Sequence, residues 1–157
     1  MLIMQGTNTN DIRKIISTIS SKLHENEVAA EIHYRLKDPY SAFKKMVRKN
    51  ISVKELTDLI AFRIIVDKKE DCYKVRDIIC SIYSVNKSKN YIDNPKDNGY
   101  RSLHVIVIDA IYNRNIEIQI RTKDMHDIAE FGTANHEEYK KTQEKSKRTE
   151  SYSKNEY

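Results

Sequence analysis

The sequence is poor in residues that break or bridge a chain, with three glycines, two prolines and two cysteines among 157 residues. Cys72 and Cys80 fall eight residues apart in one helical pattern. At about 1.5 Å of rise per residue, their Cα atoms would lie roughly 12 Å apart, too far for a disulfide. Because there is no zinc-type cluster either, we expect two reduced thiols in a reducing compartment, the cytoplasm.

Long apolar runs are also absent. No segment reaches the ~20 apolar residues that a membrane span needs, and the N-terminal stretch lacks a long apolar run. We therefore expect a protein without membrane contacts. The net charge of +5 suits a phosphate-rich ligand, although a solvated basic surface is the commoner reason for an excess of this size.

Apolar periodicity predicts an α+β domain in which a small sheet is flanked by helices. Helices are expected at 12–23, 38–50, 70–83 and 124–139, with a short helical stretch at 54–57. Strands are expected at 58–66, 103–109 and 115–121, the last two forming a hairpin. Residues 86–100 are predicted to be a polar loop. The predicted layout is an N-terminal helix of the same domain in 1–30, the domain body in 31–140 and a charged, disordered tail in 141–157.

The strand at 115–121 has the most informative pattern, NIEIQIR. Its three isoleucines point to one face, which we expect in the core. The opposite face presents an acid, an amide and a guanidinium in a row, from Glu117, Gln119 and Arg121. Taken alone, this pattern is more typical of an antiparallel sheet with one solvated side than of a site.

Asp58 adds a reason to interpret that face as a site. It stands before a strongly apolar strand, where a carboxylate has no packing role. If Asp58 faced Glu117 from a neighbouring strand, the two carboxylates would hold a Mg²⁺ ion over a triphosphate. A residue of a turn or a helix end is the alternative interpretation of Asp58.

Two further stretches concentrate ligands for phosphate and bases. Arg35 and Lys37 precede the helix at 38–50, and Ser41 and Lys45 share one of its faces, so its N-terminus is a candidate anion site. A solvated basic helix face is the alternative. The segment 89–104 is rich in Lys, Asn, Tyr and His, and Tyr100 near its end is placed either to stack on a base or to anchor the loop to the sheet.

These stretches together resemble the synthetase region of the RelA/SpoT family. The matching motifs, in order, are Arg35-x-Lys37-x-x-x-Ser41, Asp58-x-x-x-x-Arg63, NPKxNGYRSLH at 94–104 and EIQIRT at 117–122. The helix from 124 onward is similar to the family's closing helix, so the resemblance runs from 35 to 140. The third and fourth motifs are far more specific than a short glycine pattern. The departures from the family pattern affect no expected site residue and lie at Ile60, Asn90, Asn135 and Glu137.

The resemblance implies a nucleotidyltransferase-like fold and pyrophosphate transfer from ATP to the 3′-hydroxyl of GDP or GTP. It implies Mg²⁺ held by Asp58 and Glu117, with Glu117 sharing the metal or accepting the proton of the hydroxyl. The implied ATP-binding residues are Arg35, Lys37, Ser41, Lys45 and Arg63. The implied acceptor-binding residues are Lys89, Lys96, Asn98, Tyr100, His104, Gln119 and Arg121, with Tyr100 stacked on the guanine.

There are two alternatives, of which only the second belongs to another class of function. In the first, the enzyme transfers pyrophosphate to another acceptor, an adenine nucleotide or the 3′ end of tRNA, with which the basic tail is compatible. Otherwise the chain is a non-catalytic nucleotide-binding remnant, against which the retention of both carboxylates, Arg35, Lys37 and Tyr100 argues. A chain of this length has no room for the family's hydrolase and regulatory domains, so hydrolysis of the product is not expected. A homo-oligomer is left open.

Overall fold

The structure is a computed structural model that describes residues 9–36, 39–52, 60–110 and 113–132. Its five strands form one mixed sheet in the order β1-β2-β5-β4-β3. The strands β2 and β5 are parallel, and every other neighbouring pair is antiparallel. The bounds of the strands are β1 Glu31–Leu36, β2 Ile60–Val66, β3 Ser84–Asn90, β4 Leu103–Asp109 and β5 Arg114–Thr122.

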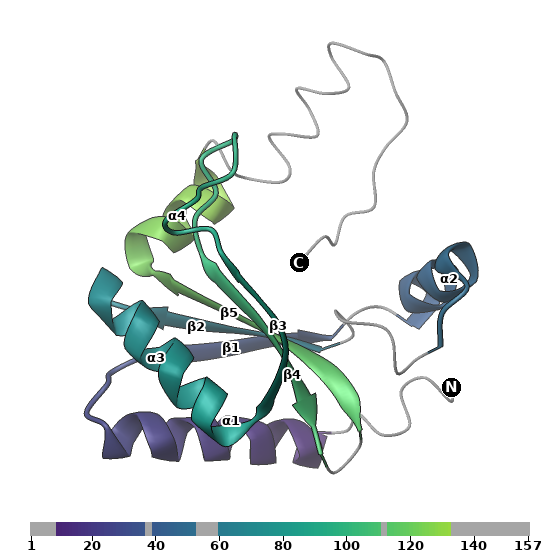
Figure 1. Cartoon of the computed structure of the whole chain (residues 1–157), viewed down its shortest axis with the longest axis horizontal. Coiled ribbons are helices and arrows are strands. Elements are labelled where there is room, and N and C mark those ends of the chain that lie inside the picture. The colour runs from purple at the N-terminus through teal and green to yellow at the C-terminus, as the bar shows by residue number, and fades with distance from the viewer. Residues whose placement is uncertain (1–8, 37–38, 53–59, 111–112, 133–157) are drawn as a thin grey trace.

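The helices of these ranges are α1 Thr9–Glu25, α2 Pro39–Lys49, α3 Lys69–Ile82 and α4 Lys123–Phe131. Figure 1 shows α1 and α3 together on one side of the sheet, α4 after the end of β5 and α2 to the side, beyond the end of β1. The side chain of Thr122 accepts a hydrogen bond from the backbone N–H of Met125, which caps the start of α4.

The core lies between the sheet and the helices α1 and α3. Ile19 of α1, Ile79 of α3, Phe62 of β2 and Ile118 of β5 are fully buried in one cluster. Each such side chain contributes about 1.5–3 kcal/mol relative to an exposed one. The alternating isoleucines of β5 all face this cluster, so the opposite face of the sheet is available for polar side chains.

The predicted α+β class is confirmed, as are the helices at the start of the chain, after Pro39 and at 70–83. The hairpin of β4 and β5 is also as predicted. The prediction of a loop over 86–100 is wrong for its first part, because β3 continues to Asn90. The expected helical stretch at 54–57, the first residues of the strand at 58–66 and residues 133–139 of the last helix lie outside the described residues.

None of the helices in the described ranges has the length and apolar character needed to cross a membrane.

The two cysteines are free thiols in contrasting environments on α3, and this difference is testable. Burial, followed by the nearby charges of Asp71 and Glu70, raises the pKa of Cys72 to about 12, whereas Cys80 is exposed with a pKa raised by partial desolvation. Since the thiolate is the nucleophile, iodoacetamide near pH 8 should alkylate Cys80 in the native protein and leave Cys72 unmodified. Peptide mass spectrometry would measure both sites, with denatured protein, in which both react, as the control. Equal native rates would contradict the packing of α3.

Candidate active site

The candidate site lies on the face of the sheet opposite α1 and α3. Strand pairing aligns residues of all five strands across this face, because directly opposite residues share a face. One row runs through Arg35, Ala61, Glu117, Ile106 and Lys87. The neighbouring row runs through His33, Arg63, Gln119, His104 and Lys89. Residues that are far apart in the sequence are therefore brought together around β5.

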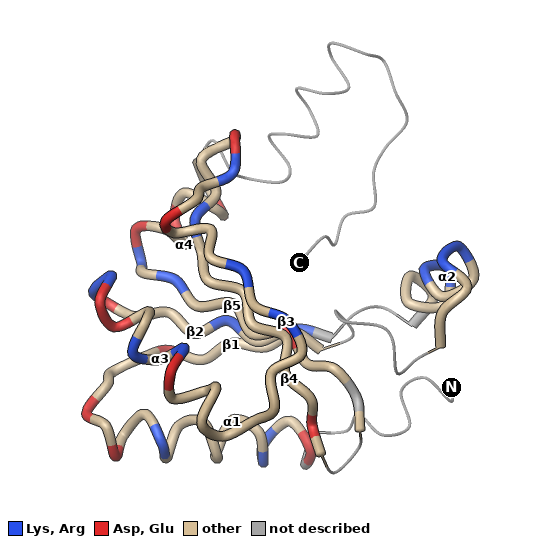
Figure 2. The backbone as a smooth tube through the Cα atoms, in the orientation of Figure 1, with Lys and Arg blue, Asp and Glu red and all other residues tan. Residues whose placement is uncertain are grey.

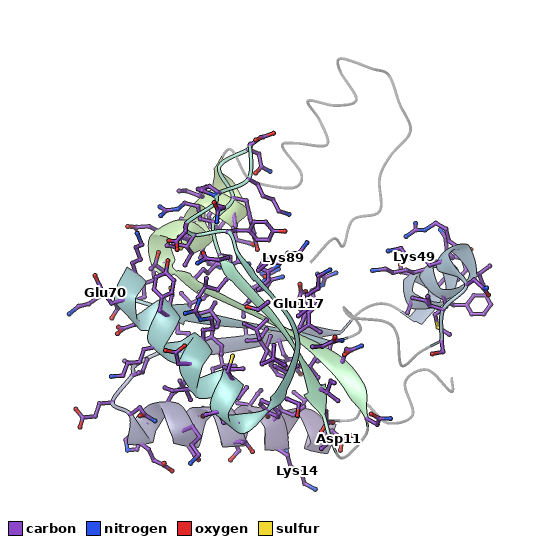
Figure 3. All side chains as sticks on the ribbon, viewed as in Figure 1. Asp11, Lys14, Lys49, Glu70, Lys89 and Glu117 are labelled. Carbon is purple, nitrogen blue, oxygen red and sulfur yellow. The ribbon has the colours of Figure 1, made fainter. Side chains whose placement is uncertain are left out.

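Glu117 is the middle residue of the first row and lies between two hollows in this face of the sheet. The hollow on the side of β3 and β4 has a volume of about 140 Å³ and is lined by Lys87, Lys89, Tyr91, His104, Ile106 and Glu117. The hollow on the side of β1 and β2 is smaller and is lined by His33, Tyr34, Arg35, Ala61 and Arg63. Figure 3 shows Glu117 and Lys89 in the same region of the sheet, away from Asp11 and Lys14 on α1. Adjacent strands are about 4.8 Å apart, so Arg63 and Lys89 are separated by roughly 14 Å.

Both hollows are lined by cations, as anionic ligands would require. Lys87 and Lys89 line the larger hollow, and Arg35 and Arg63 line the smaller one. The guanidinium of Arg63 also lies 3.5 Å from the carboxylate of Glu130 on α4. Figure 2 shows further Lys and Arg residues on α2. The carboxylate of Glu117 thus lies between two pairs of positively charged side chains.

His104 is a partly buried residue of the larger hollow and contacts both Tyr100 and Glu117. Its Nε2 lies 2.8 Å from the Tyr100 hydroxyl, and its Nδ1 lies 3.5 Å from a carboxylate oxygen of Glu117. Burial, followed by the charges of Arg121, Lys96 and Lys89, lowers the pKa of His104 to about 3. The imidazole is therefore neutral at pH 7.

Tyr100, Gln119 and Arg121 are buried behind the site, with 5%, 0% and 0% of their surface exposed. Arg121 donates to the Tyr100 hydroxyl over 3.0 Å and to the side-chain oxygen of Gln119. Its other terminal nitrogen lies 3.5 Å from the His126 ring on α4. Beyond Glu117, this face of β5 is therefore not solvated, because α4 and the segment before β4 cover its last residues.

The segment between β3 and β4 is fixed at both ends. The side chain of Asn90 accepts hydrogen bonds from two backbone N–H groups, of Ile92 and Asp93, and Asp93 also accepts from the Tyr73 hydroxyl of α3 over 2.6 Å. Asn90, a departure from the family pattern, thus shapes this segment. Gly99 has a φ of 91°, a conformation that favours glycine.

The expected acceptor residues of this segment lie around Tyr100. The Lys96 ammonium lies 4.8 Å from the ring centroid of Tyr91 and 5.3 Å from that of Tyr100. The side chain of Asn98 accepts from the Tyr100 backbone N–H. Lys96 and Asn98 are therefore placed beside Tyr100, and Lys89 and His104 line the hollow itself.

The expected ATP-binding residues come from three elements. Arg35 and Arg63 share the smaller hollow, whereas Ser41 and Lys45 lie half-buried on α2, beyond the end of β1. Lys37 and Asp58 lie outside the described residues. Ala61, three residues after Asp58, is directly opposite Glu117.

Lys87 and Tyr91 line the larger hollow and were not predicted from the sequence. The alternation of Lys87 and Lys89 was a usable signal, since residues two apart on a strand share a face. The loop predicted for 86–100 does not use this signal, because it includes the end of β3. No sequence pattern indicated Tyr91 as a residue of the site.

The chemistry of the donor set suits Mg²⁺ better than a transition metal. Among the described residues, no three His, Cys, Asp or Glu side chains gather into a metal-binding group. Mg²⁺ needs less from the protein, since it usually takes one or two carboxylates together with substrate phosphates and waters. Glu117 beside two cation-lined hollows fits that requirement.

Comparisons with known proteins show the family and the fold of the chain. The family described as "Region found in RelA / SpoT proteins" matches residues 34–144, so the chain belongs to the RelA/SpoT family. It is 40% identical over 131 residues to a protein of Brucella ovis named GTP pyrophosphokinase rsh, a match that covers 82% of this chain and 17% of that protein. The chain therefore spans about a sixth of the length of this relative.

Two solved structures share the fold. The small alarmone synthetase 2 of Bacillus subtilis is 27% identical, with a TM-score of 0.65 over 90% of this chain and 77% of the other. The small alarmone synthetase 1 of the same organism, bound to its product pppGpp, has a TM-score of 0.64 at 22% identity, over 83% and 74% of the two chains. The fold is that of the small alarmone synthetases.

Proposed function

We propose that this chain transfers pyrophosphate from ATP to the 3′-hydroxyl of GDP or GTP and releases AMP. The observation that carries the proposal is the position of Glu117 between two cation-lined hollows on one face of the sheet. The name of the Brucella ovis relative, and the product pppGpp of the Bacillus subtilis synthetase with the same fold, support this reaction.

The reaction requires positioning and charge neutralisation more than covalent help. The 3′-oxygen bonds to the β-phosphorus of ATP while the bond between that phosphorus and the oxygen of AMP breaks, and the hydroxyl loses its proton. We propose that the Glu117 carboxylate accepts this proton. A well-placed base typically contributes 10²–10⁴-fold to the rate.

The two hollows suggest how the substrates divide between them. We propose that Arg35, Lys37, Ser41, Lys45 and Arg63 hold ATP. Lys87, Lys89 and Tyr91 would then join Lys96, Asn98 and His104 around the acceptor. Two phosphorylated nucleotides repel each other, and cations on both sides of Glu117 offset that repulsion.

Stacking of guanine on Tyr100 is part of the proposal. The ring is only 5% exposed and the Lys96 ammonium lies over it. Guanine would reach the ring once Lys96 moves toward the acceptor's phosphates. Base–aromatic stacking contributes about 1–3 kcal/mol.

We propose that Asp58 and Glu117 hold Mg²⁺. In the sequence, Asp58 stands two residues before β2, the strand whose Ala61 is directly opposite Glu117, which supports this proposal. When bound, the ion neutralises phosphate charge. The cytoplasm, which supplies both nucleotides and suits two free thiols, is the proposed compartment.

The decisive experiment is incubation with γ-labelled ATP and each acceptor in turn: GDP, GTP, ATP and tRNA. We expect label in the guanosine product and release of AMP. Transfer to ATP or tRNA alone would replace the proposed acceptor. An absence of transfer to all four, in a protein that still binds ATP, would leave a nucleotide-binding remnant.

Alanine variants test the division of the substrates. Arg35→Ala and Lys45→Ala should each raise the KM for ATP by roughly tenfold or more, because a hydrogen bond to a charged group contributes about 1.5–3 kcal/mol. The KM for the acceptor should change far less. Lys89→Ala is the matched control and should show the opposite pattern. Initial rates with each substrate varied in turn measure both constants, and equal effects on both substrates would refute the division.

A further inference from the structure

A branched chain of polar contacts runs behind Glu117 and begins at the buried guanidinium of Arg121. One branch passes from Arg121 to the Tyr100 hydroxyl over 3.0 Å and on to Nε2 of His104 over 2.8 Å. It ends where Nδ1 of His104 lies 3.5 Å from Oε2 of Glu117. The other branch passes from Arg121 to the side-chain oxygen of Gln119, whose Nε2 lies 3.4 Å from Oε1 of Glu117. Both branches therefore end on the same carboxylate.

The guanidinium sets the direction of both branches because it donates and never accepts. In the second branch, the Gln119 oxygen must face Arg121, which turns its NH₂ group toward Glu117. In the first branch, the Tyr100 oxygen accepts from Arg121, and the phenolic proton points to Nε2 of His104. Because Nε2 accepts this proton, the ring carries its own proton on Nδ1, the nitrogen that faces Glu117.

The opposite tautomer is disfavoured at both ends of the imidazole. A proton on Nε2 would compete with Arg121 for the Tyr100 oxygen. It would also leave a lone pair on Nδ1 directed at a carboxylate oxygen 3.5 Å away. In this buried site, where the side chains of His104 and Glu117 are each 14% exposed, such a repulsive contact is weakly screened.

We propose that Arg121 and the Tyr100 hydroxyl are positioning residues, which fix His104 as its Nδ1–H tautomer and orient both carboxylate oxygens of Glu117. The tautomer stands on the geometry alone. Its effect on the rate rests on the proposed function, in which Glu117 accepts the proton of the 3′-hydroxyl. An oriented carboxylate presents the same lone pairs to the acceptor in every turnover.

The tautomer can be measured in the protein without nucleotides or divalent metal. Long-range ¹H–¹⁵N correlation spectra identify the protonated ring nitrogen. The couplings distinguish the two nitrogens, because Nε2 couples to both carbon-bound ring protons and Nδ1 to one, and the ¹⁵N chemical shift shows which of them carries the proton. His104→Gln identifies the His104 signals by their loss. We expect the Nδ1–H pattern in the parent protein, its loss in Tyr100→Phe, and its retention in Tyr91→Phe. Tyr91→Phe is the matched control because the Tyr91 ring also contacts His104, at 5.1 Å between ring centroids.

The rate supplies a second measure. Tyr100→Phe should lower kcat by roughly three- to tenfold, as expected for one lost hydrogen bond, with little change in the KM of the acceptor. A role for the Tyr100 ring alone would leave both kcat and the tautomer unchanged. An Nε2–H tautomer in the parent protein would overturn the proposal, and so would an unchanged tautomer in Tyr100→Phe. The spectrum of the parent protein tests the proposal even if a variant does not fold. A parent with the Nδ1–H tautomer and no transfer activity would instead overturn the proposed function.

Discussion

Glu117→Gln is expected to lower kcat by about 10²–10⁴-fold, the usual contribution of a general base, and to leave the melting temperature close to that of the parent. The amide has the same shape as the carboxylate and keeps one oxygen, so the packing of β5 is retained. It cannot accept the proton of a 3′-hydroxyl, and it binds a cation more weakly than a carboxylate. Single-turnover rates at saturating nucleotides, together with a thermal melt, measure the two effects separately.

Glu31→Gln is the matched control, because Glu31 is an exposed carboxylate on the same sheet, on the edge strand β1. Its kcat should stay within about twofold of the parent, as is usual for a change at an exposed surface residue. Asp58→Asn should be as severe as Glu117→Gln if the two carboxylates share an ion. A Glu117→Gln protein with an unchanged kcat and a raised acceptor KM would show that Glu117 binds the acceptor and does not act as the base.

The sequence predicted the elements that are buried on at least one face. The strands β2, β4 and β5 carry apolar residues that pack on α1 and α3, and their patterns indicated strands. The strand β3 reads SVNKSKN and is exposed along almost its whole length, so its pairing with β4 leaves no apolar pattern. An edge strand that is exposed to solvent on both faces has the composition of a loop. Only its pairing with a neighbouring strand identifies it as a strand.

Part of the site was predictable, because the sequence motifs contain the residue types that form it. The register of the strands determines which of these residues are neighbours, and sequence motifs do not contain that information. Arg63 and His104 lie on either side of Gln119 because β5 runs between β2 and β4. The burial of Arg121 was not predicted from the sequence, because its partner Tyr100 comes from a segment twenty-one residues earlier.

The burial of Arg121 predicts a large loss of stability in Arg121→Met, about 2–5 kcal/mol, or a drop of roughly 5–15 °C in the melting temperature. Methionine fills much of the volume but donates no hydrogen bond. The oxygens of Tyr100 and Gln119 would then lose their shared donor inside the protein, where each unsatisfied group costs about 1–3 kcal/mol. Arg63→Met is the matched control: the same change on the neighbouring strand, at a partly exposed side chain, should cost less than about 1 kcal/mol.

A double variant separates lost hydrogen bonds from lost packing. In Arg121→Met, the side-chain oxygens of Tyr100 and Gln119 each lose the hydrogen bond from Arg121. Adding Gln119→Leu removes one of these two oxygens, so the double variant should lose about 1–3 kcal/mol less stability than the sum of the losses in the single variants. Purely additive losses would mean that the side-chain volume of Arg121, and not its hydrogen bonds, holds this region together. If Arg121→Met melts like the parent and only binds the acceptor more weakly, then Arg121 is a direct ligand of the nucleotide, as the family resemblance implied, and the branched chain to Glu117 does not direct the carboxylate.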